Sequence, residues 1–270
     1  MANDRSTREI IDQARLVGDE DAYWRLIGDL HERGGAEEFQ AASRLCRSNA
    51  AVDREIGADI LGQLGWAKRH FHDESVAHLI SLLADPVDDV VASAAYALGH
   101  RQAAAAIPKL LALTEHPNPR VRHAVTFGLL GLEVDAAIGG LIRLSGDADE
   151  EVRNWATFGL GSQIEADSPA IRQALVDRLG EENDEIAGEA LLGLARRHAP
   201  MALPLVSAAL QRDGLNGLIV QAAETLADPR LLPLLEVWRN RGGEPADAYF
   251  DGLVEDAWQA CLNGKEASEG

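Results

Sequence analysis

Two stretches of this sequence, RVRHAVTFGLL (120–130) and EVRNWATFGLG (151–161), share one pattern at a spacing of 31 residues. Aligned on the end of this pattern, the chain holds seven copies, which end at His31, Gly62, Gly99, Leu130, Gly161, Ala195 and Ala227. Their successive separations are 31, 37, 31, 31, 34 and 32 residues. A sustained period in this range is typical of stacked supersecondary units, each of which needs its neighbours to bury its apolar face.

Each repeat unit reads as a turn followed by two helices. The turn is rich in Asp, Glu, Asn and Pro, as in DPVDD before VVASAAYALG. Such side chains accept hydrogen bonds from the free N–H groups at the start of a helix and favour its positive end. Proline lies near the start of the second helix in four units, where its missing N–H costs little. The sequence therefore predicts an all-α protein of about seven helix pairs.

The motif Asp-x-x-Val-Arg-x-x-Ala-x-x-x-Leu-Gly, best kept in residues 118–131 and 149–161, resembles that of the HEAT-repeat superfamily. It is most similar to the short bacterial HEAT-like repeats of the phycobilisome-lyase type, and the similarity covers nearly the whole chain. The resemblance implies a right-handed α-solenoid whose Val-Arg helices line the concave face. We expect an N-terminal capping helix in 1–20, the solenoid in 21–240, a C-terminal capping helix in 241–262 and a disordered tail in 263–270.

Arginine recurs at one position of the motif, at Arg54, Arg122 and Arg153. In the superfamily that this chain resembles, such an arginine pairs with a turn aspartate of the next unit. Asp89 and Asp149 are the candidate partners in this sequence. The resemblance thus implies a structural role for these arginines, and we assign them none in function.

Composition narrows the possible partners. The formal net charge is −19, which disfavours nucleic acid because that binding depends on Lys and Arg at phosphates. An acidic protein instead attracts basic partners. The two cysteines lie far apart in sequence, the N-terminus lacks the apolar region of a secretory signal, and no run approaches the ~20 apolar residues of a membrane span. We therefore expect a cytoplasmic protein with no membrane contact.

The helix that starts at Val152 carries aromatic residues away from its apolar stripe. At 100° per residue, Val152, Ala156 and Leu160 share the buried arc, whereas Phe158 points nearly opposite and Trp155 lies on the flank. The position of Phe158 recurs in each repeat as a column: Gly28, Asp59, Tyr96, Phe127, Phe158, Leu192 and Glu224.

Aromatic anchors ringed by polar groups are the usual composition of an interface hot spot. We predict that Tyr96, Phe127, Trp155 and Phe158 anchor a partner, that His123 and Asn154 make polar contacts, and that Glu55, Asp59, Glu189 and Glu224 form an acidic rim that steers it. The alternative is that these rings pack within the solenoid, and for Trp155, on the flank, this structural interpretation is favoured.

Enzyme signatures are mostly missing from the sequence. The segment RHFHDESVAH (69–78) has His and Asp residues, but no second cluster shares its spacing, so we expect an inter-repeat loop and no metal. The His-Glu pairs of the di-iron deoxyhypusine hydroxylases are not matched, since the corresponding position reads His123-Ala124. The basic groove of HEAT-like DNA glycosylases is not matched either. No phosphate-loop, hydrolase or dinucleotide motif is present, so we predict no enzyme activity and no cofactor.

The combination of RGGAEEFQAASRLCRS, REIGADILGQLG and EVRNWATFGLG resembles a group of bacterial HEAT-repeat proteins, some of which are encoded beside polymorphic Rhs-type toxins and regarded as their immunity proteins. We therefore predict a non-enzymatic protein that binds and inhibits a basic protein in its concave groove. The alternatives are a phycobilin-lyase-like chaperone or lyase subunit, which would bind a chromophore, and a generic peptide-binding scaffold.

Overall fold

The computed structural model describes residues 5–65, 70–212, 214–241 and 248–269. Within these ranges the chain is helical and contains no strand. It divides into two compact units, Met1–Gly140 and Leu141–Gly270, here called the N-terminal and C-terminal units. Each unit is a stack of helix pairs, which confirms the prediction of an all-α solenoid.

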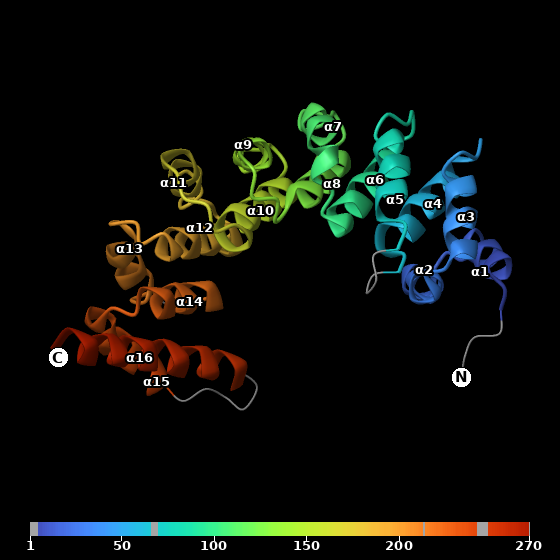
Figure 1. The fold of residues 1–270 in the computed structure, drawn as a ribbon. Coiled ribbons are helices and arrows are strands. Elements are labelled where there is room, and N and C mark those ends of the chain that lie inside the picture. Colours follow the sequence, from blue (N-terminus) through green and yellow to red (C-terminus); the bar gives the residue numbers. More distant parts are fainter. Residues whose placement is uncertain (1–4, 66–69, 213, 242–247, 270) are drawn as a thin grey trace. The chain divides into compact units, whose positions relative to one another are not determined.

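The N-terminal unit contains α1 (Thr7–Ala14), α2 (Glu20–Arg33), α3 (Ala36–Leu45), α4 (Ala51–Gln63), α5 (His72–Leu82), α6 (Asp88–Arg101), the 3₁₀ turn η1 (Ala104–Ala106), α7 (Ile107–Ala112) and α8 (Pro119–Leu129). The helices that carry the repeat motif, α2, α4, α6 and α8, pack side by side in sequence order (Figure 1). We call them the motif row of this unit. The paired helices α3, α5 and α7 pack against α4, α6 and α8, respectively.

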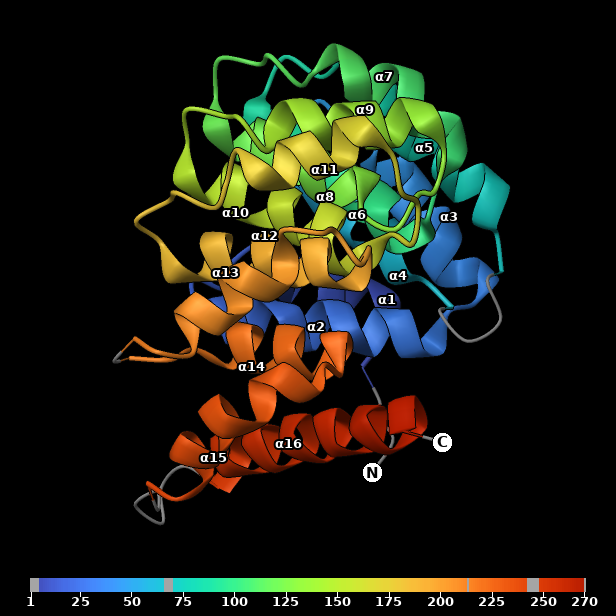
Figure 2. The same ribbon diagram turned by 90° about the vertical axis from the view of Figure 1, so that its left-hand side faces the viewer.

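The C-terminal unit continues the same alternation. After α9 (Asp135–Leu144), whose span includes the boundary between the units, come α10 (Glu150–Phe158) with a π-helical end η2 (Gly159–Gln163), α11 (Pro169–Val176), α12 (Asp184–Arg196), α13 (Ala202–Ala209), α14 (Gly217–Leu226), η3 (Pro229–Leu231), α15 (Leu232–Arg239) and α16 (Ala248–Glu269). Its motif row is α10, α12 and α14. The last helix, α16, packs along both α14 and α15 (Figure 2).

Polar turn residues cap five of the seven motif-row helices as predicted, whereas α4 and α6 begin without a side-chain cap. The side chains of Asp19, Asn118, Asp149, Asn183 and Asn216 each accept a hydrogen bond from a backbone N–H in the first turn of the helix that follows. Proline is at the first or second position of α7, α11 and α15. Local sequence therefore determines where these helices begin.

The expected end of the chain differs from the structure. Residues 263–270 were expected to form a disordered tail, but α16 continues to Glu269. One physical reason is the close packing at Gly264, where a Cβ atom would lie 2.1 Å from the carbonyl oxygen of Ala227 at the end of α14. Only glycine allows this approach, which brings α16 against the end of α14 at residue 264.

The recurring arginines are structural, but their acidic partners differ from those expected. Arg54 makes a two-pronged ion pair with Asp85, with N···O distances of 2.6 and 2.8 Å. Arg153 does the same with Glu181 at 3.2 and 3.1 Å. Asp149 is instead the N-cap of its own helix, where its side chain accepts a hydrogen bond from the backbone N–H of Val152.

Asp89, the other expected partner, belongs to another ion pair. It lies in the first turn of α6 and accepts a hydrogen bond from Arg120 at 2.5 Å. The partner of Arg54, Asp85, precedes that helix and also accepts a bond from the backbone N–H of Val87. Asp85 is thus a residue of the turn itself. Its bond to Val87 tightens the turn, and its ion pair with Arg54 joins two repeats.

Two buried arginines, which the sequence analysis did not single out, hold successive motif-row helices together. Arg101 is 3% exposed, and its guanidinium donates to the carbonyl oxygens of Leu61 at 2.7 Å and Leu64 at 3.0 Å. Arg197 is 8% exposed and donates to the carbonyls of Leu160, Ile164 and Ala166. Carbonyls at the end of a helix lack partners within it, so each arginine satisfies the end of the preceding motif-row helix.

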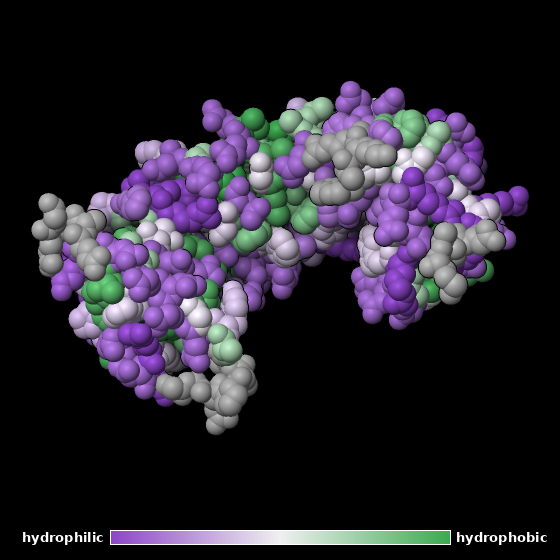
Figure 3. All heavy atoms as spheres, turned by 60° about the horizontal axis from the view of Figure 1, so that its bottom comes forward, coloured by the Kyte–Doolittle hydropathy of each residue, from purple (hydrophilic) through white to green (hydrophobic). Residues whose placement is uncertain are grey.

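Apolar residues fill the interior of each unit, and polar residues cover most of its surface. On the face drawn in Figure 3, hydrophilic residues predominate, with hydrophobic residues visible between them. None of the helices in the described residues combines the length and the apolar character needed to cross a bilayer.

Candidate functional site

Eight of the ten predicted binding residues line two hollows, one on the motif row of each unit, whereas His123 and Glu224 line neither. The N-terminal hollow has a volume of about 700 Å³, and the C-terminal hollow has a volume of about 500 Å³. The first is lined by residues that include Glu55, Asp59, Tyr96 and Phe127. The second is lined by Glu151, Asn154, Trp155, Phe158, Glu185, Glu189 and Leu218.

The aromatic rings of the N-terminal hollow form a cluster from α6 and α8. Tyr96 and Phe127 meet edge to face with ring centroids 5.5 Å apart, and His100 contacts Phe127 in the same way at 5.0 Å. The Tyr96 hydroxyl forms a hydrogen bond with Nδ1 of His123 at 2.5 Å. His123 is therefore a positioning partner of Tyr96 and is not itself among the residues that line the hollow.

The acidic residues of this hollow are less exposed than a rim would be. The Tyr23 hydroxyl donates to Oδ2 of Asp59 at 2.5 Å, and burial raises the pKa of Asp59 to about 6. Burial, followed by the nearby charge of Asp89, also raises the pKa of Glu55. Glu55 and Asp59 are predicted to belong to an acidic rim that steers a partner, and the structure places both carboxylates half-buried, because α2 packs against this part of α4.

The C-terminal hollow joins two aromatic rings with three carboxylates. Trp155 and Phe158 meet edge to face, with ring centroids 5.7 Å apart and an interplanar angle of 85°. The side-chain amide of Asn154 donates to Oε2 of Glu185 at 3.1 Å. The hollow thus presents aromatic ring surfaces beside carboxylates, which are negatively charged hydrogen-bond acceptors.

Glu189, expected on an exposed rim, is a buried residue. It is 8% exposed, accepts a hydrogen bond from the Ser162 hydroxyl at 2.6 Å, and has its pKa raised by burial. The reason is the close approach of η2 to α12: a Cβ atom on Gly161 would lie 2.6 Å from the carbonyl oxygen of Glu189. The carboxylate forms part of the wall of the hollow rather than its edge.

The positions equivalent to Phe158 do not all face outward in the later motif-row helices. Leu192, the next member after Phe158, is buried in α12, and Glu224 is exposed on α14 but lines neither hollow. The helical wheel of the α10 repeat therefore does not predict which residues of α12 and α14 line a hollow.

Some residues that line the hollows are not among the binding residues predicted from the sequence. Tyr23 and the 46% exposed Trp24 line the N-terminal hollow from α2. Glu151 and Glu185 line the C-terminal hollow, four residues before Trp155 and Glu189. Residues four apart share one face of a helix, so this spacing is the signal that identifies the two glutamates.

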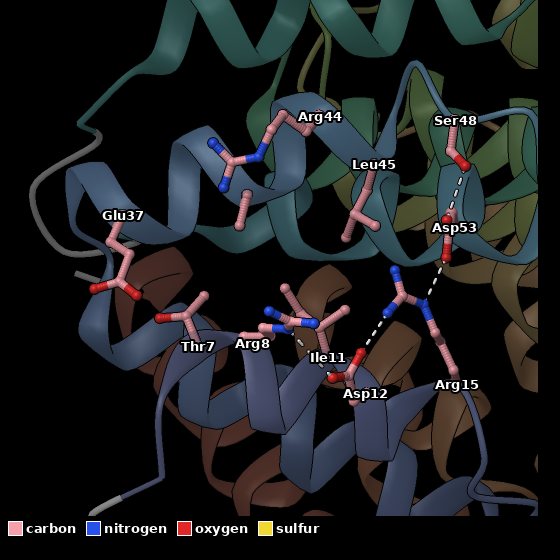
Figure 4. A pocket seen from close by; sticks show the side chains of 11 residues that line it. Thr7, Arg8, Ile11, Asp12, Arg15, Glu37, Arg44, Leu45, Ser48 and Asp53 are labelled. Carbon is pink, nitrogen blue, oxygen red and sulfur yellow. Dashed lines mark hydrogen bonds and ion pairs between the residues drawn. The ribbon is translucent and has the colours of Figure 1, made fainter.

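A third hollow, of about 540 Å³, lies between α1 and α3 and has no predicted binding residue (Figure 4). Its charges compensate each other. Arg15 pairs with Asp12 at 2.5 Å and with Asp53 at 2.7 Å, and the Ser48 hydroxyl donates to Asp53 at 2.8 Å. These bonds tie the capping helix α1 to the first full repeat, which is a structural task.

The described residues hold neither a metal-binding cluster nor a reactive thiol. No group of three or more His, Cys, Asp or Glu side chains in them is arranged to hold a metal ion. Both cysteines are buried, and burial raises the pKa of Cys46 to about 12 and that of Cys261 to about 11. Such thiols remain protonated and are poor nucleophiles at neutral pH. The prediction of an inter-repeat loop in 69–78 is wrong for residues 72–78, which lie in the helix α5, and residue 69 lies outside the described residues.

Comparison with known proteins agrees with this architecture. The family model for HEAT repeats matches residues 42–130 and 76–156. The matched residues lie in the central part of the chain, which is similar to HEAT repeats. Protein YibA of Escherichia coli (strain K12) is 29% identical over 232 residues, which is 82% of each chain. The X-ray structure of YibA aligns with a TM-score of 0.69 at 24% identity, covering 96% of this chain and 97% of that one.

Two other solved structures are similar in fold. Kap95 in the Kap95:Nup1 complex aligns with a TM-score of 0.67 and 15% identity, covering 92% of this chain and 39% of Kap95. The complex of CpcE and CpcF of phycocyanin lyase from Nostoc sp. PCC7120 gives a TM-score of 0.49 and 17% identity, covering 96% and 95% of the chains. The first similarity concerns the fold alone, and the second is too low to support an argument.

Proposed function

We propose that this chain is a non-enzymatic protein-binding scaffold and that its partner is a basic protein. The observation that carries the proposal is the repeated combination of aromatic rings and carboxylates in a hollow of the motif row, once in each unit. The C-terminal hollow is lined by three glutamates and by no Lys or Arg. The N-terminal hollow is lined by four acidic residues and two arginines.

Such hollows suit a basic partner for two physical reasons. Aromatic residues at the centre of an interface contribute most of the binding free energy, because they bury large areas at a small entropic cost. The net charge of −19 accelerates encounter with a positive surface and opposes binding of an acidic one. Kap95 in complex with Nup1 is a HEAT-like solenoid of similar fold that binds a protein.

In its narrower form, the proposal is that the bound protein is a basic toxin and that binding covers its active site. The chromophore-lyase alternative has no specific support in the hollows. Their carboxylates would repel the propionate groups of a bilin, and the described residues supply neither an exposed thiol nor a metal site.

The proposal is tested by affinity capture from an extract of the native organism with three baits. These are the wild-type chain, the Phe127→Ala/Phe158→Ala variant, and Tyr249→Ala as a control that removes an exposed aromatic ring outside both hollows. Wild type and control should retain one basic protein at near-equal stoichiometry, which the double variant loses. Each truncation should weaken binding by about 2 kcal/mol.

Circular dichroism and thermal unfolding of the three baits supply the control for folding. The proposal fails if all three folded baits retain the same proteins, or if none retains a basic protein. Inhibition of the captured protein's activity by the wild-type chain, measured with purified components, tests the narrower form.

A further inference from the structure

The C-terminal hollow is lined by a buried carboxylate, that of Glu189. Oε2 of this residue accepts the Ser162 hydroxyl bond at 2.6 Å, whereas Oε1 has no hydrogen-bond donor among the described residues. Glu189 nevertheless lines the hollow. Oε1 is open to solvent at the hollow, so an occupant that covers it costs free energy unless it supplies a donor or a cation.

Two further carboxylates lie at the same hollow. Glu185 is held by Asn154, whose amide donates to Oε2 at 3.1 Å, and Glu151 lines the hollow from the first turn of α10. No basic side chain lines the hollow to neutralise this charge. Arg196 is a nearby positive charge, but it is bonded to the carbonyl of Ser162 and to Glu165.

The rings of the hollow suit a flat cation. Trp155 and Phe158 meet at an interplanar angle of 85°, so the two ring planes stand nearly perpendicular at the hollow. A positive charge is attracted to the face of an aromatic ring. A guanidinium group is planar, stacks on aromatic faces and presents several N–H donors in a fixed fork that matches carboxylates.

We propose that the C-terminal hollow binds the guanidinium group of an arginine that projects from the partner protein. The inference rests on the proposed function, in that the occupant is a side chain of the basic partner. An anion would be repelled by Glu151, Glu185 and Glu189, and a neutral apolar group would leave Oε1 of Glu189 without a donor. A lysine ammonium is a compact, strongly hydrated charge that matches one carboxylate but neither the fork nor the stacking.

The test uses the full chain and three small probes: N-acetyl-arginine amide, N-acetyl-lysine amide and the neutral isostere N-acetyl-citrulline amide. Binding is followed by NMR at the indole N–H of Trp155, assigned by comparison with Trp155→Phe. The arginine probe should shift this resonance saturably, the lysine probe should bind about fivefold more weakly, and citrulline should produce no saturable shift.

Three variants localise the binding. Glu189→Gln keeps the size and the Ser162 bond but removes the charge, and Phe158→Leu keeps an apolar side chain but removes the ring. Each should weaken the arginine probe about fivefold or more. Glu224→Gln removes an exposed charge of the same type outside the hollow and should change the affinity less than twofold. Far-UV circular dichroism establishes that each variant is folded.

The inference is overturned if the arginine probe gives no saturable shift, if citrulline binds equally well, or if Glu189→Gln and Glu224→Gln behave alike. Its failure can be separated from that of the proposed function. A basic partner that is retained by both Glu189→Gln and Phe158→Leu but lost by the Phe127→Ala/Phe158→Ala variant supports the scaffold and overturns the arginine site. If the arginine probe binds saturably but no protein is captured, the guanidinium site stands, and the claim that a partner protein occupies it is overturned.

Discussion

Replacement of Arg197 by methionine should destabilise the C-terminal unit strongly. The guanidinium donates to four carbonyl oxygens, those of Leu160 at 2.8 Å, Ile164 at 3.1 Å, Ala166 at 2.9 Å and Gly193 at 2.9 Å. Methionine keeps the apolar stem and removes every donor. The variant therefore tests the hydrogen bonds with little change in packing.

The expected magnitude follows from the number of carbonyls that lose a donor. A buried acceptor left unsatisfied costs about 1 kcal/mol or more, so four of them amount to about 4 kcal/mol. Removing a buried charge recovers part of this, because its desolvation is no longer required. We expect a net loss of about 3 kcal/mol in the free energy of unfolding.

The neighbouring Arg196 provides a matched control. It donates to one carbonyl, that of Ser162 at 2.9 Å, and pairs with Glu165, whose side chain is 78% exposed. An exposed ion pair of this kind contributes little, so Arg196→Met should cost about 1 kcal/mol or less.

Urea unfolding followed by far-UV circular dichroism measures both variants. Because a repeat protein can unfold in parts, amide hydrogen exchange in residues 150–166 supplies a local measurement. Exchange there should accelerate in Arg197→Met and change little in Arg196→Met. Equal losses in the two variants would show that the buried guanidinium does not hold these repeats together.

Two further predictions concern the motif row. The raised pKa of Asp59, about 6 against 3.8 in the unfolded chain, means that the folded protein holds a proton that the unfolded chain has released between about pH 4 and pH 6. Stability should therefore fall as pH rises through this window. Asp59→Asn should make that slope shallower and add about 1 to 2 kcal/mol to the free energy of unfolding at pH 8, as measured by urea unfolding across pH. An unchanged slope would contradict the burial of this carboxylate. Gly193→Ala should lower the free energy of unfolding by about 1 to 3 kcal/mol, because its Cβ atom would lie 2.7 Å from Cα of Gly161. The control Gly28→Ala, whose Cβ atom would have nothing within 4 Å, should raise it by up to about 1 kcal/mol. Thermal unfolding that ranks the two variants in the opposite order would refute the close helix approach.

The sequence by itself determined the repeat, the alternation of helices and the positions at which the helices begin. These features depend on signals within one helix or turn: an apolar stripe with the helical period, a capping Asn or Asp, and a proline in the first turn. The structural role of Arg54 and Arg153 was implied by the resemblance to the HEAT-repeat superfamily, in which such an arginine pairs with a turn aspartate of the next unit. The extent of α16 was not, since it depends on the contact between Gly264 and the end of α14.

Only the tertiary structure decided which polar residues are buried and what they contact. Tyr23 meets Asp59, Ser162 meets Glu189, and Arg197 meets the carbonyl of Leu160, at sequence separations of 36, 27 and 37 residues. Each of these contacts joins one repeat to the next, and its geometry depends on how closely two helix backbones approach. A helical wheel describes one helix in isolation, so it places Glu189 on an outward face, whereas the packing of η2 against α12 encloses it.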